Sequence, residues 1–309
     1  MSGQSETKLK QLLQQVPPGF LVHSGWMARH AISRQSVSGY VKQGWLEPVM
    51  SGVYRRPFSS DTNPEAVGGW KIPLLSAVGL MRHKFHVGGA SSLALRGHAH
   101  YLSFGGEFAL YLYGSDIPAW LSKLRTDADV KTRSHVLFGE GAIGVENADF
   151  DLSNDEDPEL AQSPWRWPMP MSSPERAILE MLDEVPKGES FHKLDVAFES
   201  LANLRPRLLT TLLTLCRSVK TKRLFFVFAD KHNYAWRRHI DISSVDLGKG
   251  DRALTPGGRL HPVYRITVPA DLMPTETPNG MGANDKIRQD SRTRTTGSTI
   301  PCEYFSGEK

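Results

Sequence analysis

Five residues between positions 34 and 42 have the types and the spacing that DNA-reading helices use. At 100° per residue, Gln35, Ser38, Gly39 and Lys42 fall on one face of a helix, and Arg34 lies at its edge. Arg, Gln and Ser side chains read base edges in the major groove, and Lys meets phosphates. A glycine costs a helix about 1 kcal/mol relative to alanine, and on this face it would allow close approach of the DNA. We therefore expect this stretch to contact double-stranded DNA.

The neighbouring residues predict the helix that would carry this face. Ser33 is a good N-cap, because its hydroxyl can accept a hydrogen bond from an unpaired backbone N–H of the first turn. Val37, Tyr40 and Val41 follow at i, i+3 and i+4, which places an apolar stripe toward a core. Gly44 then suits the left-handed position just past the end of a helix.

The segments on either side complete a winged helix-turn-helix. A first helix is expected at about residues 25–30 and a supporting helix at 8–15, with Ile32 as the apolar plug between the paired helices. A hairpin follows, with its turn at residues 50–52 and its returning strand at 53–56. The wing arginines would rest on the DNA backbone. The expected DNA contacts are Ser33, Arg34, Gln35, Ser38, Gly39, Lys42, Ser51, Gly52, Arg55 and Arg56.

The charge distribution agrees with a nucleic-acid module at the start of the chain. Residues 1–60 contain seven Lys and Arg and two acids, so this segment carries +5, whereas the whole chain carries +4. A basic module on a nearly neutral remainder favours a nucleic-acid footprint. The alternative is a small helical domain with ordinary solvated charges.

The whole-chain composition describes a globular protein of two or three domains. The chain has 309 residues, with 39% hydrophobic and 23% charged residues. No apolar run approaches the ~20 residues of a membrane span, and the N-terminus lacks the regions of a signal peptide. Cys216 and Cys302 lie in different contexts, so we expect no disulfide, a cytoplasmic location and no membrane partner.

We expect an α+β fold, with the winged helix at residues 1–60, a larger mixed α/β domain at 61–272 and a disordered tail at 273–309. The second domain contains a surface loop with seven acids at 146–159 and a stiff Pro/Trp connector at 164–170. The stretch 224–228 fits either a buried strand or a buried helix. The other expected elements are helices at 64–81 (interrupted at Pro73), 93–95, 118–124, 173–182, 191–201 and 207–217, and strands at 107–113, 135–138 and 264–268.

Several patterns that resemble catalytic or metal sites are better explained as structural. The histidine pairs 83/86 and 98/100 have no nearby cysteine and no HExxH pattern, so we expect no metal. The segment 88–92 lacks the motif of a P-loop and is expected to be a turn and helix start. A Mg²⁺-dependent nuclease would rest on Asp116 and Asp129, but the context of Asp129 is polar rather than a strand edge. We therefore expect no catalytic residues and no cofactor.

A second basic run occupies residues 205–238. It contains nine bases and one acid, a net charge of +8 over 34 residues, with five aromatic residues interspersed. The run predicts a second basic surface for DNA, RNA or an acidic protein, against the alternative of a basic patch over a structural aromatic core. The bases are Arg205, Arg207, Arg217, Lys220, Lys222, Arg223, Lys231, Arg237 and Arg238.

Residues 5–272 together resemble the AbiEi-type antitoxins, the regulatory half of bacterial type IV toxin–antitoxin (abortive infection) pairs. The tail has no counterpart in this resemblance. The stretches that carry it are Gly44-Trp45-Leu46, Gly52-Val53-Tyr54, Val87-Gly88-Gly89, Leu93-Ala94-Leu95, Gly97-His98-Ala99-His100-Tyr101-Leu102, Ser172-Ser173-Pro174-Glu175-Arg176-Ala177, Cys216-Arg217-Ser218-Val219-Lys220, Lys222-Arg223-Leu224-Phe225, Asp246-Leu247-Gly248 and Gly257-Gly258-Arg259-Leu260 with Tyr264.

The resemblance implies a transcriptional autorepressor that binds inverted repeats in the promoter of its own two-gene operon. It further implies that the larger domain counteracts a nucleotidyltransferase-like toxin, without the need for a tight complex, and adds a positively charged face for DNA. The DNA-reading positions transfer to Arg34, Gln35, Ser38 and Lys42 only by their place in the helix. The expected location is the bacterial cytoplasm, associated with the nucleoid. A plain regulator without a toxin, or a DNA-targeted nuclease, remain the alternatives.

Overall fold

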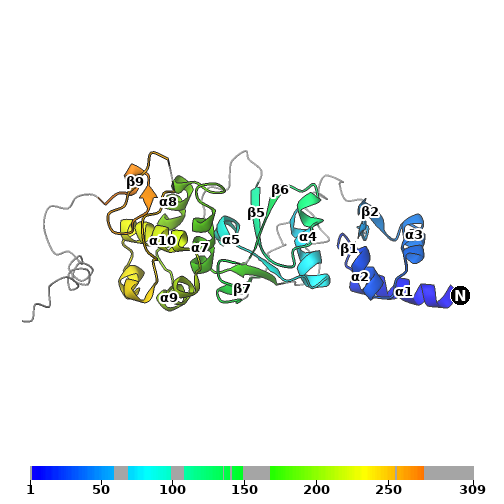
Figure 1. Cartoon of the computed structure of the whole chain (residues 1–309). Helices are drawn as coiled ribbons and strands as arrows, with labels where there is room; N and C mark the ends of the chain where they lie inside the picture. Colours follow the sequence, from blue (N-terminus) through cyan, green and yellow to red (C-terminus); the bar gives the residue numbers. More distant parts are fainter. Residues whose placement is uncertain are drawn as a thin grey trace, which may run out of the picture. The chain divides into compact units, whose positions relative to one another are not determined.

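The computed structural model describes residues 2–58, 69–98, 108–134, 136–139, 141–148, 168–254 and 256–274 (Figure 1). The expected linker at 59–63, most of the acidic loop, the connector up to residue 167 and the tail from 275 lie outside the described residues. Within the described ranges, no helix is long and apolar enough to cross a membrane.

The N-terminal part has the element order of a winged helix-turn-helix, as the sequence predicts. Its three strands form one antiparallel sheet in the order β1-β3-β2. Strand β1 was not predicted, and it pairs with the returning strand of the wing. The elements are α1 (Ser2–Gln15), β1 (Leu21–His23), α2 (Ser24–Arg29), α3 (Arg34–Lys42), β2 (Glu47–Met50) and β3 (Val53–Arg55).

The predicted signals at both ends of α3 are confirmed. The Ser33 side chain accepts a hydrogen bond from the Ser36 N–H at 3.1 Å, which pairs one of the free donors of the first turn. Gly44 has a φ of 77°, the left-handed conformation that ends a helix at little steric cost in glycine. Ile32 is 6% exposed and fills the space between α2 and α3 as expected.

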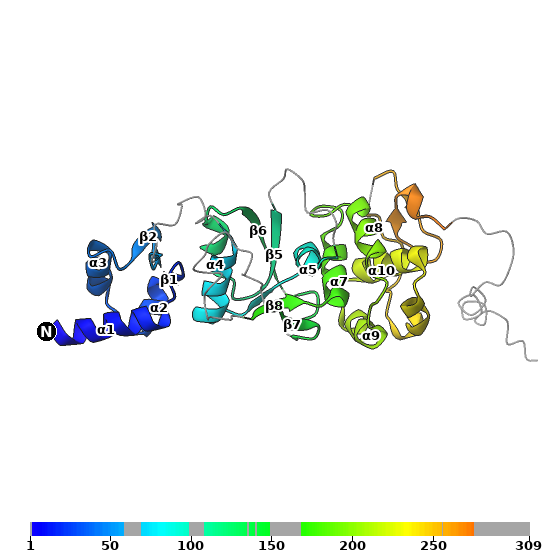
Figure 2. The same ribbon diagram turned by 180° about the vertical axis from the view of Figure 1, so that it is seen from behind.

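The larger part is built on a five-stranded mixed sheet in the order β6-β5-β4-β8-β7 (Figures 1 and 2). Side chains alternate along β5, so Leu110 and Leu112 join the hydrophobic cluster that includes α4 (Lys71–Leu75), while Tyr113 contacts the start of α5 (Gly89–Leu95) on the opposite face. The strands are β4 (Phe85–Val87), β5 (Phe108–Gly114), β6 (Ala128–Arg133), β7 (Val145–Ala148) and β8 (Met169–Ser172).

Four helices gather around a second hydrophobic cluster: α7 (Pro174–Glu184), α8 (Phe191–Glu199), α9 (Pro206–Leu215) and α10 (Val219–His232). The ambiguous stretch at 224–228 is helical. All of residues 221–229 are buried, because neighbouring elements cover α10 on every side. The chain then continues through the short elements η4 (Ala235–His239), η5 (Ile242–Ser244), β9 (Arg259–Leu260), β10 (Thr267–Val268) and η6 (Ala270–Leu272).

Some predicted elements differ from the structure. The strand expected at 135–138 is wrong: residues 136–139 form a turn, and β6 lies earlier, where it pairs in parallel with β5. Strand β7 (Val145–Ala148) occupies the first residues of the expected acidic loop, and β8 (Met169–Ser172) begins inside the expected connector, because these two segments pair with each other. The helix interrupted at Pro73 is α4 followed by a π-helical turn, η2 (Ser76–Leu80). The helix expected at 118–124 is reduced to the 3₁₀ turn η3 (Leu121–Lys123), and the last strand is shorter than expected.

Candidate nucleic-acid interface

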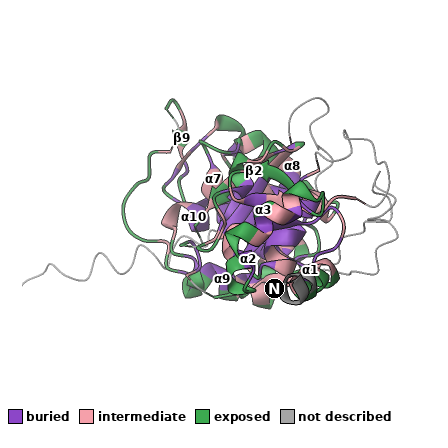
Figure 3. Ribbon diagram, turned by 90° about the vertical axis from the view of Figure 1, so that its right-hand side faces the viewer, coloured by how far each residue is buried: buried purple, intermediate pink, exposed green. Residues whose placement is uncertain are grey.

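The exposed side of α3 presents four polar side chains, Arg34, Gln35, Ser38 and Lys42, which we call the recognition face. All four residues are exposed, and none has a side-chain partner among the described residues. Val37 and Tyr40, on the other side of the helix, are 6% and 3% exposed and fix its orientation. Figure 3 views the molecule with α2, α3 and β2 toward the reader, and exposed residues (green) occur on all three elements.

Gly39 lies within the recognition face. A Cβ atom built on Gly39 would meet no atom within 4 Å, so the free protein has room for a side chain there. Packing inside the protein therefore does not require a glycine at this position. A glycine without a packing reason on an exposed recognition helix fits close approach by a ligand.

The two wing arginines have different roles. The Arg55 guanidinium forms an ion pair with Glu47 across the hairpin at 3.2 Å and keeps part of its surface exposed. Arg56 instead donates to the backbone carbonyls of Leu13 and Val16, each at 2.6 Å, at the C-terminal end of α1. Part of the Arg56 guanidinium thus satisfies carbonyls at the end of α1, and its expected contact with the DNA backbone stays a prediction.

The turn of the wing is held against the start of α2. The Ser24 N–H donates to the Gly52 carbonyl at 2.8 Å, and Gly52 has a φ of 76°. A Cβ on Gly52 would lie 3.2 Å from the Ser24 hydroxyl and 3.5 Å from the His23 ring. His23 in turn accepts from the Gly25 N–H at 3.1 Å and caps α2. Burial, with help from the charges of His83 and Arg29, lowers the pKa of His23, which favours the neutral form that can accept this bond.

The second basic run does not form a surface of nine free cations. Lys222 and Arg223 are 5% and 3% exposed, so for these two the expectation is wrong. The Arg223 guanidinium donates to four backbone carbonyls in the segment 247–265, at 2.7 to 3.1 Å, and so fixes an irregular part of the chain. Two stretches that carry the family resemblance, residues 222–225 and 246–248, are thereby joined.

Four more bases of the run are engaged within the protein. Arg205 pairs with Glu175 and Glu146 at 2.9 and 2.7 Å, Lys231 with Asp195 at 2.6 Å, and Arg237 with Asp230 at 2.6 Å. Lys220 donates to the carbonyls of Asp183 and Val185. Three bases are exposed without a side-chain partner among the described residues: Arg207, Arg217 and Arg238.

A buried polar network links the sheet to α7. Glu180 is 1% exposed, and its carboxylate accepts from His86 at 3.0 Å, Arg176 at 2.8 Å, the Gly89 N–H at 2.9 Å and the Ser172 hydroxyl at 2.7 Å. Burial acts to raise the pKa of Glu180, but the two basic partners and their hydrogen bonds outweigh it and hold the pKa at about 2. All four oxygen contacts are internal, so the cluster acts as a structural link between β4, β8, α5 and α7.

This network explains the glycine pair that resembled a phosphate loop. The expected turn and helix start are confirmed, with Gly88 as the N-cap of α5. A Cβ on Gly88 would lie 2.2 Å from a Glu180 carboxylate oxygen, which requires glycine at this position. The anion that meets the Gly89 N–H at the start of the helix is therefore the protein's own carboxylate.

The residues weighed for metal or nuclease chemistry lie apart in ordinary ion pairs. Asp116 contacts His83 at 3.1 Å, and Asp129 contacts Lys131 at 2.6 Å. Asp129 lies in strand β6 rather than in a polar loop. His98 is described, whereas His100 lies outside the described residues. Among the residues that the structure places, no group of three or more His, Cys, Asp and Glu side chains is arranged to hold a metal ion.

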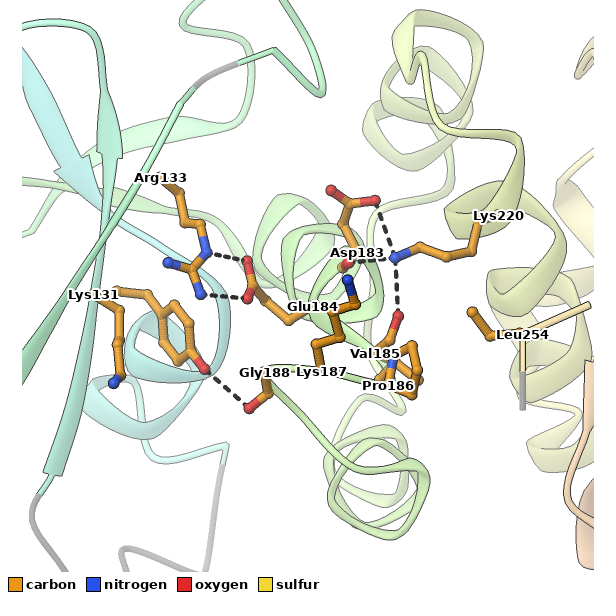
Figure 4. A pocket seen from close by; sticks show the side chains of 11 residues that line it. Lys131, Arg133, Asp183, Glu184, Val185, Pro186, Lys187, Gly188, Lys220 and Leu254 are labelled. Carbon is orange, nitrogen blue, oxygen red and sulfur yellow. Dashed lines mark hydrogen bonds and ion pairs between the residues drawn. The ribbon is translucent and has the colours of Figure 1, made fainter. Parts of the chain in front are cut away.

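A cavity of about 810 Å³ opens between β6, the end of α7 and the start of α10 (Figure 4). Its charged groups are mostly paired with one another. Arg133 forms a bidentate ion pair with Glu184 at 2.6 and 2.7 Å, and its guanidinium lies over the Tyr111 ring. The Tyr111 hydroxyl donates to the Gly188 carbonyl. Lys220 is held by the carbonyls at the end of α7, as described above. The lining therefore consists largely of contacts that join the sheet to the helices.

The fold defines a winged helix-turn-helix protein with a larger α/β part, and the exposed polar side of α3 is the kind of surface that such proteins carry. Comparison with protein families identifies which one. The chain belongs to the AbiEi family: residues 108–269 match the family described as "Transcriptional regulator, AbiEi antitoxin, Type IV TA system", and residues 5–104 match the N-terminal domain of the same regulators. The resemblance inferred from the sequence is thus confirmed.

Among solved structures, the chain is similar to the RV2827C protein from Mycobacterium tuberculosis. The two share 13% sequence identity with a TM-score of 0.47, over 85% of this chain and 90% of the other. A comparison with curated protein sequences gave no match.

Proposed function

We propose that this protein represses transcription of its own operon by binding inverted repeats in the promoter through α3 and the wing, and that it counteracts a nucleotidyltransferase-like toxin encoded beside it. The observation that carries the DNA half of this proposal is the recognition face. Arg34, Gln35, Ser38 and Lys42 are exposed together on one helix, and their side chains make no hydrogen bond or ion pair with residues outside their own helix that the structure describes, apart from the capping turn at Ser33. Four polar groups left free on a helix held by its buried side match the way recognition helices enter the major groove.

The first experiment measures binding of the full-length protein to the DNA upstream of its own reading frame by gel shift. Wild-type protein is expected to bind, and affinity should fall steeply between 50 and 200 mM salt because phosphate neutralisation releases counterions. The variant Arg34→Ala/Lys42→Ala should lose the shift. A matched control, Lys123→Ala/Lys249→Ala, removes two exposed positive charges elsewhere in the chain and should bind as wild type does.

Two results would overturn the DNA half. If both double variants weaken binding equally, net charge rather than the recognition face carries the affinity. If Arg34→Ala/Lys42→Ala binds as wild type does, α3 is not the recognition helix. Circular dichroism of each variant checks that the fold is intact, which we expect because all four side chains are exposed.

The antitoxin half assigns neutralisation to the larger domain. Its support is that residues 108–269 match the family described as an antitoxin of a type IV TA system. Co-expression with the neighbouring reading frame should restore growth that this frame alone inhibits. The variant Arg34→Ala/Lys42→Ala should still restore growth, since neutralisation would not require operator binding. Loss of rescue in this folded variant would show that the two tasks are not separate.

The second basic run enters the proposal in a reduced form. Within the run, Arg207, Arg217 and Arg238 have no side-chain partner among the described residues, so we propose at most a salt-sensitive contribution from them. If all three meet phosphates, replacing them with Ala lowers the slope of log affinity against log salt by about 2.7, at roughly 0.9 for each contact. An unchanged slope assigns DNA binding to the winged helix alone.

A further inference from the structure

A groove of about 760 Å³ lies between α3 and the wing, with α2 as its floor. One wall is formed by the start of α3, including Arg34, and the other by the wing residues Ser51, Gly52 and Tyr54. Gly25 and Ala28 of α2 also line the groove, and their small size leaves its space open. We call this the wing groove. Its volume is in the range of sites that bind ligands.

Three residues that line the wing groove carry hydroxyl groups without a hydrogen-bond partner among the described residues. Ser24, Ser51 and Tyr54 all line it, and none of their side-chain oxygens makes a hydrogen bond to a described residue. Arg34 also lines the groove, and its side chain makes no hydrogen bond or ion pair to a described residue. None of the lining residues is an Asp or Glu. The groove therefore offers several donors and one positive charge, a combination that suits an anion.

The groove is formed before any ligand arrives. The wing turn is bonded to α2 through the Ser24 N–H and the Gly52 carbonyl at 2.8 Å, and β3 pairs with both β1 and β2. The Tyr54 side chain is half-buried, and its ring packs against the hydrophobic cluster beneath the sheet. Because the walls are fixed by backbone bonds and packing, little conformational entropy is lost when the donors meet a ligand.

We propose that the wing groove holds the sugar–phosphate backbone of one DNA strand, with Ser24, Ser51 and Tyr54 as neutral donors to phosphate oxygens. This inference rests on the proposed function, since α3 must lie on the DNA for a strand to run beside it. Charge complementarity and the small floor residues select the backbone over bases. Ser24 and Tyr54 were not among the contacts expected from the sequence.

Neutral donors and charged side chains at a phosphate differ in how they affect the salt dependence of DNA affinity. A lysine or arginine at a phosphate releases counterions, so its loss lowers both affinity and salt dependence. A hydroxyl donates a hydrogen bond without adding charge, so its loss lowers affinity and leaves the salt slope unchanged. Because a phosphate is the same at every base pair, the loss is equal on specific and unrelated DNA.

The test compares Tyr54→Phe, Ser24→Ala/Ser51→Ala and Arg34→Ala in the full-length protein. Each is titrated with the upstream fragment and with an unrelated duplex of equal length, from 50 to 200 mM salt. Tyr54→Phe should weaken binding about tenfold on both duplexes, as expected for a hydrogen bond to a charged group, with the wild-type slope. Arg34→Ala should also reduce the slope, by about 0.9. Ala28→Leu, which keeps a good helix former, fills the groove and should weaken binding as well.

The outcomes separate this inference from the proposed function. If wild-type protein binds and Arg34→Ala does not, while Tyr54→Phe and Ala28→Leu bind as wild type does, the wing groove is empty and the recognition face stands. If wild-type protein binds neither duplex, both proposals fail. If Tyr54→Phe weakens binding only to the upstream fragment, the hydroxyl contacts a base and the assignment to the backbone is wrong. Inorganic phosphate at 10 mM, with ionic strength held constant by chloride, should not displace the duplex. Displacement would indicate a site for free anions instead.

Discussion

Replacing Gly39 with alanine tests the recognition face with a single methyl group. The position is the sixth of nine residues in α3, and it is absent from the glycines with positive φ. Nothing lies within 4 Å of the built Cβ, so the free protein gains the helix propensity of alanine without a steric cost. The expected gain in the free energy of unfolding is about 1 kcal/mol. That corresponds to roughly 2–4 °C in the melting temperature for a cooperative unit of this size.

DNA binding should change in the opposite direction. If the base edges or the backbone approach α3 as closely as a glycine permits, the added methyl group overpacks the contact. Overpacking a close interface costs about 1–3 kcal/mol, which weakens binding roughly 5- to 150-fold. A variant that is more stable and binds less well is difficult to explain by damage to the fold. The opposite signs of the two effects make the substitution informative.

The assay pairs urea denaturation with a DNA titration at fixed salt. Gly141→Ala is the matched control, since its built Cβ also meets no atom within 4 Å and it lies far from α3 in sequence. We expect the control to bind DNA as wild type does. A Gly39→Ala protein that is stabilised and binds with unchanged affinity would refute close approach at this helix face. A destabilised one would refute the assignment of open space around residue 39.

Three further outcomes follow from the internal contacts. Glu180→Gln should lower the free energy of unfolding by about 3–5 kcal/mol, because it leaves buried basic groups without a carboxylate. In the wild-type protein the pKa of Glu180 is about 2 in the fold against 4.5 ordinarily, so the stability that this carboxylate provides is present above pH 4.5 and is lost as pH falls toward 2. Urea denaturation across that pH range measures both effects. His23 has a lowered pKa in the fold, so the unfolded chain takes up its proton first and wild-type stability should fall as pH drops below about 6.5. His23→Asn, which keeps a capping acceptor, should lessen this fall, and an unchanged pH dependence would assign it to another group. Arg223→Met should cost about 3 kcal/mol and expose the segment 246–268 to proteolysis, while DNA binding of the folded protein stays at the wild-type value.

The winged helix could be predicted because its signals are local. The N-cap at Ser33, the apolar stripe of α3, the glycine past its end and the wing turn all act within a few residues of one another. Such signals depend on backbone conformation and helix periodicity, which the sequence displays directly. The missed strand β1 is three residues long, too short for alternation to be visible, and it exists because β3 pairs with it.

The second basic run shows that the net charge of a segment omits acidic partners from other parts of the chain. The run has nine bases and one acid, yet Arg205 and Lys231 are neutralised by Glu175, Glu146 and Asp195, which lie outside it. Paired charges of this kind contribute little to an external field. The net charge of a segment therefore predicts a surface only where the fold leaves the charges unpaired.

Local sequence thus determined the winged helix, the exposed polar side of α3 and, through the combination of stretches along the chain, the family. Tertiary structure decided which cations are free, which glycine pair is packed against a buried carboxylate, and that Ser24 and Tyr54 share a groove with Arg34. The physical reason is the distance along the sequence over which each kind of interaction acts. Helix caps and periodicity act over a few residues, whereas ion pairs, burial and grooves depend on segments that only folding brings together.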